Sequence, residues 1–124
     1  MNSARRVVGP LMLVFLGACS TAQTLTLDDN GMQVAMSTGD EIELVLTGNP
    51  STGYGWVVTE APSILEEVGE TEFLPESDLI GAGGEFHFRF VATEPGTAQL
   101  LLVYERPFEE AEPADAFEIE VTVR

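Results

Sequence analysis

Apolar residues recur at every second position along most of the chain after Thr24, and turn-forming residues interrupt them at short intervals. A period of two places alternate side chains on opposite faces of a strand, whereas a helix would repeat every 3.6 residues. The pattern therefore predicts an all-β domain. The expected strands are 24–27, 32–36, 41–46, 56–59, 64–73, 85–92, 97–104 and 117–123.

The segment 85–92 shows the clearest alternation. Phe86, Phe88 and Phe90 share one face and should supply much of the core, while His87 and Arg89 share the other face. Since the outward face of such a strand is normally polar, we expect His87 to be a solvated residue with no chemical role.

Turn residues mark the connections between the predicted strands. Asp28-Asp29-Asn30-Gly31 is a hairpin or kink signal between the first two strands. Pro62 and Pro75 bound the weaker segment 64–73, as proline should bound a strand. Glu94-Pro95-Gly96 predicts a tight turn, because proline presets one backbone angle and glycine tolerates a positive φ.

Strands of this length and spacing predict one two-sheet β-sandwich with Greek-key connections. The immunoglobulin-like arrangement, here with seven or eight antiparallel strands, is the commonest solution of this kind. A small closed barrel is also compatible with the pattern.

The N-terminal residues follow the order of an export signal. Arg5 and Arg6 precede an apolar stretch, 7–16, that is shorter than the roughly 20 residues needed to span a bilayer. The tetrad Leu16-Gly17-Ala18-Cys19 resembles a bacterial lipobox, in which the cysteine thiol receives a lipid. An ordinary cleaved signal with an incidental cysteine is the alternative.

The lipobox interpretation divides the chain into three parts. We expect a lipoprotein signal peptide at 1–18, cleaved before Cys19, then a short tether at 19–23 and one domain at 24–124. Lipid on Cys19 would hold the protein at a membrane of the bacterial cell envelope, facing the periplasm or the exterior. Because Cys19 is the only cysteine, the chain has no internal disulfide.

The charge balance is strongly acidic, with a net charge of −16. After residue 18, Arg89, Arg106 and Arg124 are the only fixed cations beside 21 Asp and Glu, and lysine is absent. Nucleic acid is therefore not an expected partner, because phosphate binding requires clustered Arg and Lys. Such acidity either steers the protein toward cationic partners or reflects solubility and salt adaptation.

The residues for catalysis or metal binding are also missing. His87 is the sole candidate general base, and no Cys and His ligands occur at zinc spacing. The acidic run 109–115 could hold calcium loosely, but it lacks the glycine and the ligand spacing of an EF-hand. We therefore expect neither an enzyme nor a cofactor.

Three connections between strands have unusual sequences: Asn49-Pro50-Ser51-Thr52-Gly53-Tyr54, Gly81-Ala82-Gly83-Gly84 and Arg106-Pro107-Phe108. The small residues of the first allow close approach of its backbone to a partner. The glycines of the second leave backbone groups unshielded, so that these could pair with an extended partner strand. The third places a planar cation beside an aromatic ring, and these residue types dominate interface hot spots.

In this order the three loops resemble the signatures of the chagasin family of cysteine peptidase inhibitors, which are Asn-Pro-Thr-Thr-Gly-Tyr, Gly-x-Gly-Gly and Arg-Pro-Trp. The resemblance extends from Met32 to Val123. Two residues depart from it. Ser51 replaces the first threonine but keeps its hydroxyl, and Phe108 replaces tryptophan with a smaller ring, which should weaken binding by about 1 kcal/mol.

The resemblance implies a monomeric, reversible, non-covalent and competitive inhibitor of papain-like cysteine peptidases, which covers the active-site cleft with three adjacent loops. It places the first loop over the catalytic Cys and His of the peptidase, the second on the non-prime side and the third on the other flank. The implied peptidase-binding residues are Asn49, Pro50, Ser51, Thr52, Gly53, Tyr54, Gly81, Gly83, Gly84, Arg106, Pro107 and Phe108.

The main alternative is an immunoglobulin-like surface lipoprotein that acts as a structural or ligand-binding module without inhibitory activity. A sugar-binding or calcium-binding module is a further alternative, and its thermal stability would depend on metal. The structural module gives no reason for three loop motifs in this order.

Overall fold

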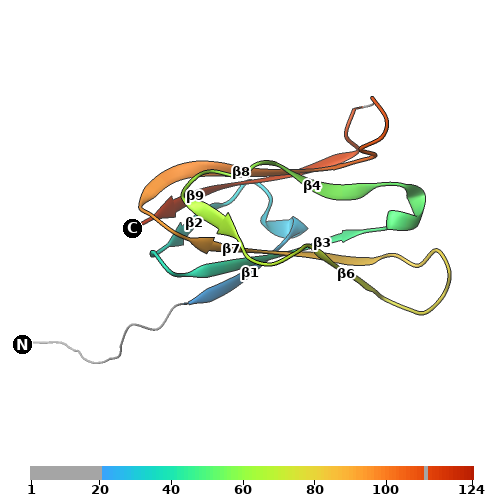
Figure 1. The fold of residues 1–124 in the computed structure, drawn as a ribbon, viewed down its shortest axis with the longest axis horizontal. Coiled ribbons are helices and arrows are strands. Elements are labelled where there is room, and N and C mark those ends of the chain that lie inside the picture. The colour runs from blue at the N-terminus through green and yellow to red at the C-terminus, as the bar shows by residue number, and fades with distance from the viewer. Residues whose placement is uncertain (1–20, 111) are drawn as a thin grey trace, which may run out of the picture.

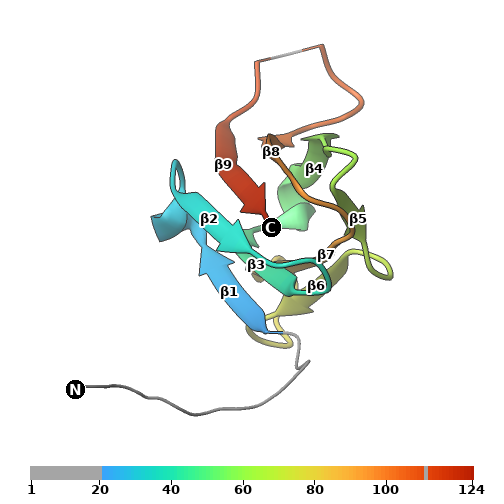
Figure 2. The same ribbon diagram turned by 90° about the vertical axis from the view of Figure 1, so that its left-hand side faces the viewer.

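Two β-sheets pack face to face across one apolar core, and Figure 2 shows both layers end-on. The computed structural model describes residues 21–110 and 112–124, so that Cys19 and the predicted signal peptide lie outside the described residues. No helix in the described part is long and apolar enough to cross a membrane. The strands are β1 (Ala22–Thr26), β2 (Gln33–Met36), β3 (Glu41–Gly48), β4 (Gly55–Glu60), β5 (Leu65–Glu67), β6 (Glu72–Pro75), β7 (Gly84–Ala92), β8 (Gly96–Glu105) and β9 (Asp115–Val123), with 3₁₀ turns η1 (Leu27–Asp29) and η2 (Pro50–Thr52).

The strand order confirms the immunoglobulin-like sandwich. One sheet has the order β1-β3-β7-β5, with β6 also paired to β7, and the other has the order β2-β9-β8-β4. The described residues form nine strands rather than seven or eight, and two pairings, β1 with β3 and β2 with β9, are parallel rather than antiparallel. Both parallel pairs involve the N-terminal segment, whose strand β1 joins one sheet and whose strand β2 joins the other.

The prediction of a hairpin at 28–31 is wrong, whereas the kink interpretation is right. Thr26 and Asp29 form a reciprocal capping box around η1, which ends the first strand. The side-chain oxygen of Asn30 then accepts a hydrogen bond from the amide of Glu118 at 2.8 Å. These bonds carry the chain from one sheet to the other, so β1 and β2 do not pair.

Several predicted strand boundaries also differ by one or two residues, and one predicted strand is divided. The first strand begins at Ala22 instead of residue 24, because its backbone pairs with β3 from Glu41 onward. The weak segment 64–73 is two strands, β5 and β6, which both pair with β7. Gly69, at φ +73°, lies between them and interrupts the extended backbone.

The core matches the predicted alternation. Phe86, Phe88 and Phe90 are buried, and full burial of a phenylalanine contributes about 1.5 to 3 kcal/mol. The buried residues of β3, β8 and β9 complete the core between the sheets. Those that are at most 1% exposed are Ile42, Leu44, Leu46, Phe90, Ala92, Leu100, Leu102, Phe117, Ile119 and Val121.

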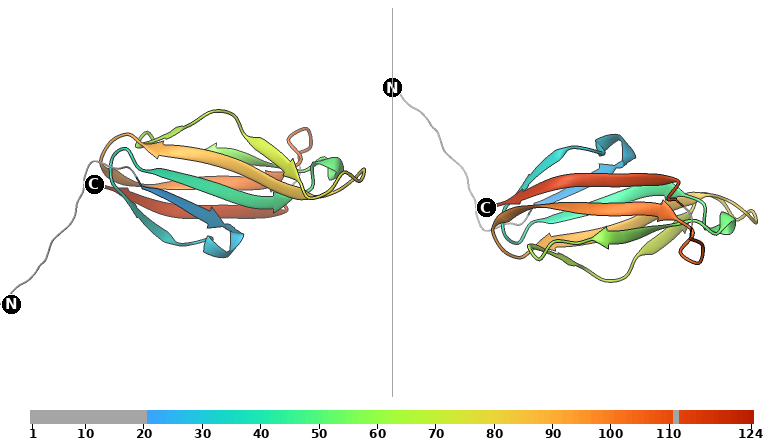
Figure 3. Two further views of the ribbon diagram at one scale, coloured as in Figure 1. Left: turned by 90° about the horizontal axis from the view of Figure 1, so that it is seen from below. Right: turned by 90° about the horizontal axis from the view of Figure 1, so that it is seen from above.

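The connections β3–β4, β6–β7 and β8–β9 lie together at one end of the sandwich, as both views in Figure 3 show. The first described residues and the C-terminus lie at the opposite end (Figure 1). The fold therefore brings the three loops singled out in the sequence to a common edge.

Candidate functional site: the three-loop edge

The site consists of loop 1 (residues 49–54), loop 2 (76–83) and the described residues of loop 3 (106–110 and 112–114), which together form what we call the loop edge. Each loop leaves the end of a paired strand, so its base is fixed by a β-ladder. The residues predicted from the three motifs all lie in this edge or at its base, where Gly84 begins β7.

Loop 1 is a short 3₁₀ turn. Asn49 caps it, because its side-chain oxygen accepts hydrogen bonds from the amide of Ser51 at 3.0 Å and from its hydroxyl at 2.6 Å. Pro50 occupies the first position of the turn, where a missing N–H costs nothing. The hydroxyl of Thr52 donates to the carbonyl of Asn49 at 2.6 Å, so the turn is closed by its own side chains.

Gly53 is required by both conformation and space. Its φ of +89° is the left-handed region that other residues rarely adopt. A methyl group on Gly53 would also lie 3.1 Å from the ring of Phe108. The glycine therefore lets loop 1 and loop 3 approach each other closely.

Arg106 joins loop 3 to loop 1. Its Nε donates to the carbonyl of Thr52 at 3.0 Å, and its guanidinium carbon lies 4.6 Å from the centre of the Tyr54 ring. Its Nη1 lies 3.4 Å from a carboxylate oxygen of Glu109, a bond within loop 3. A guanidinium that both stacks and donates fixes two loops at once.

Aromatic rings support loop 1 from below. Tyr104 stacks on Tyr54 at 5.2 Å, and Trp56 contacts Tyr104 at 5.1 Å. The Tyr104 hydroxyl accepts a hydrogen bond from the amide of Asn49 at 2.8 Å, and the indole N–H of Trp56 donates to the carbonyl of Thr47 at 3.0 Å. Tyr54 belongs to the first of the three motifs, whereas Trp56 and Tyr104 lie outside them.

The glycines of loop 2 serve a different purpose from the one predicted. The carbonyl of Gly83 accepts a hydrogen bond from the amide of Glu76 at 3.0 Å, and Gly84 pairs with β3 and β6. A side chain on Gly84 would collide with the carbonyl of Leu74. The expectation that these backbone groups are open to a partner is therefore wrong for Gly84 and the Gly83 carbonyl, because close packing of strands requires the glycines.

Three large apolar side chains of the loop edge face solvent. Phe108 is 73% exposed, Leu79 is 78% exposed and Ile80 is fully exposed. Apolar groups gathered on an exposed edge mark an interaction surface. Leu79 and Ile80 were not predicted from the sequence. Their signal there is an adjacent apolar pair that breaks the alternation and is followed by the glycines of loop 2.

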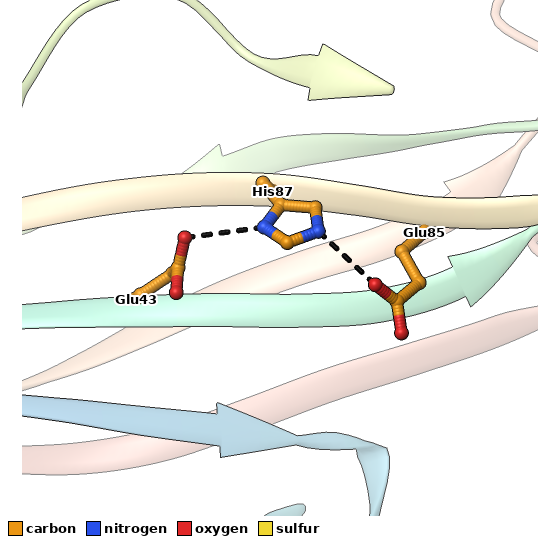
Figure 4. A network of polar contacts seen from close by, with 3 residues as sticks. All are labelled: Glu43, Glu85 and His87. Carbon is orange, nitrogen blue, oxygen red and sulfur yellow. Dashed lines mark hydrogen bonds and ion pairs between the residues drawn. The ribbon is translucent and has the colours of Figure 1, made fainter. Parts of the chain in front are cut away.

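His87 lies away from the loop edge, on the outer face of the first sheet. Figure 4 shows it between Glu43 of β3 and Glu85 of its own strand, with ring nitrogens 3.1 and 3.2 Å from their carboxylates. Burial opposes protonation, but the two carboxylates outweigh it and raise the pKa of His87 above its ordinary value. The residue is therefore an ion-pairing strand residue rather than the fully solvated one expected.

The described part of the chain has no group of three or more His, Cys, Asp or Glu residues placed to hold a metal ion. The loop edge contains no His and no Cys. What the loop edge offers instead is a shaped surface of backbone, hydroxyl, aromatic and aliphatic groups.

Residues 35–123 match the model of the chagasin family of peptidase inhibitors, I42. The chain belongs to this family. It is 31% identical to Amoebiasin-1 of Entamoeba histolytica over 101 residues, which cover 82% of this chain and 99% of that protein. It is 34% identical to chagasin of Trypanosoma cruzi over 89 residues, which cover 68% of this chain and 81% of chagasin.

Solved structures agree on the fold. The cysteine protease inhibitor EhICP2 from Entamoeba histolytica superimposes with a TM-score of 0.76 at 24% identity, covering 87% of this chain and all of the other. Members of the family are peptidase inhibitors and not enzymes.

Proposed function

We propose that the chain inhibits papain-like cysteine peptidases by placing the loop edge in the active-site cleft. The observation that carries the proposal is the combination of three exposed apolar side chains with two hydrogen bonds between loops, from Arg106 to loop 1 and from Asn49 to loop 2. Family membership supports the same role. Loop 1 would cover the catalytic Cys and His of the peptidase, with loops 2 and 3 on its two flanks.

Inhibition would be reversible and non-covalent. Loop 1 is a 3₁₀ turn closed by bonds between Asn49, Ser51 and Thr52, whereas a peptidase cleaves a bond held in an extended strand. The turn therefore presents its backbone without offering an extended scissile bond. Tight binding would follow from the low entropy lost by loops that are already ordered.

The peptidase-binding surface would be larger than the three motifs. Leu79 and Ile80 lie at the tip of loop 2, and their exposure leaves apolar surface for a partner to bury. Together with loop 1 and Phe108, they span an edge suited to a standard interface of about 800 Å² per partner.

The test is the inhibition constant of residues 20–124 against papain and a cathepsin L-type peptidase. This segment keeps every described strand. We expect competitive inhibition with an inhibition constant below about 1 μM, equivalent to a binding free energy of about −8 kcal/mol or tighter. Inhibition should not decline during the assay. The matched variant is Thr52→Ala with Phe108→Ala, which should fold and fail to inhibit. A folded wild-type domain without inhibition would favour the surface-lipoprotein alternative.

We also propose that the protein is exported and held at a membrane through a lipid on Cys19. The lipobox-like tetrad before Cys19 supports this. β1 begins at the end of the sandwich opposite the loop edge (Figure 1). The carbonyl of Thr21, just before β1, accepts a hydrogen bond from the amide of Glu41. An anchor near Thr21 would therefore leave the loops facing away from the membrane, where a peptidase can reach them.

Fractionation of cells that produce the full chain tests the anchor. Wild-type protein should sediment with membranes and incorporate a labelled fatty acid, and Cys19→Ser should do neither. Equal distribution of both proteins in the soluble fraction would contradict the anchor and leave the inhibitory role untouched.

A further inference from the structure

Asn49 uses both ends of its side-chain amide inside the protein. Its oxygen accepts the two hydrogen bonds from Ser51 that close loop 1. Its nitrogen donates to the carbonyl of Gly81, at the tip of loop 2, at 2.9 Å. An amide whose oxygen already accepts two bonds has no acceptor capacity left for a partner.

The bond from Asn49 to Gly81 joins the tip of loop 2 to another loop. The other hydrogen bonds there stay within the loop: Leu79 N–H to the Ser77 hydroxyl at 3.2 Å and Ala82 N–H to the Leu79 carbonyl at 3.1 Å. These bonds shape the tip but do not fix it relative to its neighbours. Among the described residues, Asn49 alone reaches the tip from another loop through a hydrogen bond.

The tip matters because it carries the exposed side chains of Leu79 and Ile80. If the tip moved freely, it would have to become ordered on binding. The conformational entropy lost by its side chains and backbone would then weaken the binding free energy. A tip held beside loop 1 loses less entropy, and it meets the partner in a fixed position relative to Thr52.

We propose that Asn49 is a positioning residue, which holds the apolar tip of loop 2 in place and does not itself contact the peptidase. This inference rests on the proposed peptidase-binding function. It changes the role predicted for Asn49 from the sequence, which was direct contact. It also explains the residue type, because only a side chain with an acceptor and a donor at this length makes both sets of bonds.

Two substitutions separate the two ends of the amide. Asn49→Asp keeps an oxygen for the Ser51 bonds but faces the Gly81 carbonyl with a second acceptor. Asn49→Ser keeps a good cap residue, adds no charge and is too short to reach Gly81. Asn30→Ser is the matched control, since the amide of Asn30 also bonds a backbone group but lies at the β1–β2 crossing.

The first readout needs no peptidase. In the full chain purified in detergent, amide hydrogen exchange is measured residue by residue. We expect exchange at Ala82 to accelerate roughly 10-fold in Asn49→Ser and Asn49→Asp, with exchange at Gly53 unchanged. Unchanged exchange at Ala82 in both variants would overturn the proposal.

The second readout is a double-mutant cycle on the inhibition constant for papain. We expect Asn49→Ser to weaken inhibition roughly 10-fold in the wild type, but less than about 2-fold when Leu79→Ala and Ile80→Ala are already present. Asn30→Ser should change neither value. Equal losses in both backgrounds would show direct contact and overturn the positioning role.

The two proposals fail in different ways. If wild-type protein does not inhibit papain but Asn49→Ser still accelerates exchange at Ala82, the link between the loops stands and the inhibitory function is wrong. If wild-type protein inhibits and the cycle is additive, the function stands and the positioning role is wrong.

Discussion

The two ends of the sandwich are built from similar turns but are finished differently. At the end opposite the loop edge, backbone bonds join Gly39 to Ala92 and Thr38 to Arg124, and the Asp40 carboxylate accepts from Thr21 and Ser37. None of the exposed large apolar side chains of the described residues lies in these turns. At the loop edge, side chains bridge the loops and three large apolar groups face solvent.

The difference supports the loop edge as the binding end that we propose. Turns that only close a sandwich satisfy their own polar groups and bury their apolar ones. At the loop edge, the side chains of Asn49, Thr52 and Arg106 hydrogen-bond loop carbonyls, yet apolar surface is left exposed. A preformed binding surface requires ordered loops whose apolar side chains are still exposed, because the partner then buries those side chains.

The largest expected effect comes from removing the aromatic support under the loop edge. Trp56 is buried, and its replacement in Trp56→Ala should cost about 3 to 5 kcal/mol of unfolding free energy. Trp56→Phe keeps a ring and loses the bond to Thr47, so about 1 kcal/mol is expected. Urea unfolding followed by far-ultraviolet circular dichroism measures both. Equal midpoints for Trp56→Ala and wild type would contradict this support.

The next effect concerns binding and not stability. Phe108→Ala should weaken peptidase inhibition roughly 10-fold, about 1.4 kcal/mol, without shifting the unfolding midpoint, because the ring is 73% exposed. Phe108→Trp should strengthen inhibition by restoring ring area. Met32→Ala, an exposed apolar residue away from the loop edge, is the control and should change nothing. If Phe108→Ala inhibits as strongly as wild type, the proposed contact of loop 3 with the peptidase is wrong.

A third effect is confined to the opposite end. Hydrogen bonds from the amides of Thr21 and Ser37 lower the pKa of Asp40, so its contribution to stability is present above its unfolded pKa and is lost as pH falls through the folded value. Asp40→Asn should lower unfolding free energy at neutral pH by about 1 kcal/mol and reduce the loss on acidification. Inhibition should not change. A change in the inhibition constant would contradict the claim that the end containing Asp40 takes no part in peptidase binding.

The smallest effect lies between the ends, at His87. Because its folded pKa is raised, its ion pairs stabilise the fold fully below the unfolded pKa, and that contribution disappears as pH rises through the folded value. Wild type should therefore exceed His87→Gln in stability by less than about 1 kcal/mol at acidic pH, with a smaller difference in alkaline solution. Other charged residues around this site are Glu70, Glu72 of β6 and Arg89. The opposite pH trend in thermal unfolding would exclude these ion pairs.

Alternation predicted most of the fold because burial is periodic in a strand. Phe86, Phe88 and Phe90 were assigned to the core from spacing alone and are buried. The crossing at Asn30 was ambiguous, because the same Asn-Gly signal fits a hairpin and a kink. Only the distant partner Glu118 decides between them.

The loop edge could be predicted in content but not in internal structure. The motifs predicted three adjacent loops that contain Asn49 and Arg106. The bonds from Asn49 to Gly81 and from Arg106 to Thr52, however, depend on how separate loops meet in space. Leu79 and Ile80 resemble core residues in the sequence, and only the structure leaves them in solvent. For the peptidase-binding role of these residues, the sequence and the fold supply a prediction that binding data must test.

The most direct test of the central claim is the affinity of the domain for papain whose cleft has been filled. Papain is prepared in two forms, one with a small methylthio group on the catalytic Cys and one alkylated by a bulky peptidyl inhibitor. If the loop edge occupies the cleft without covalent chemistry, the methylthio form should still bind with an affinity near that of free papain, and the filled form should lose at least about 100-fold. Equal binding to the filled and free forms would place the contact outside the cleft and contradict the account.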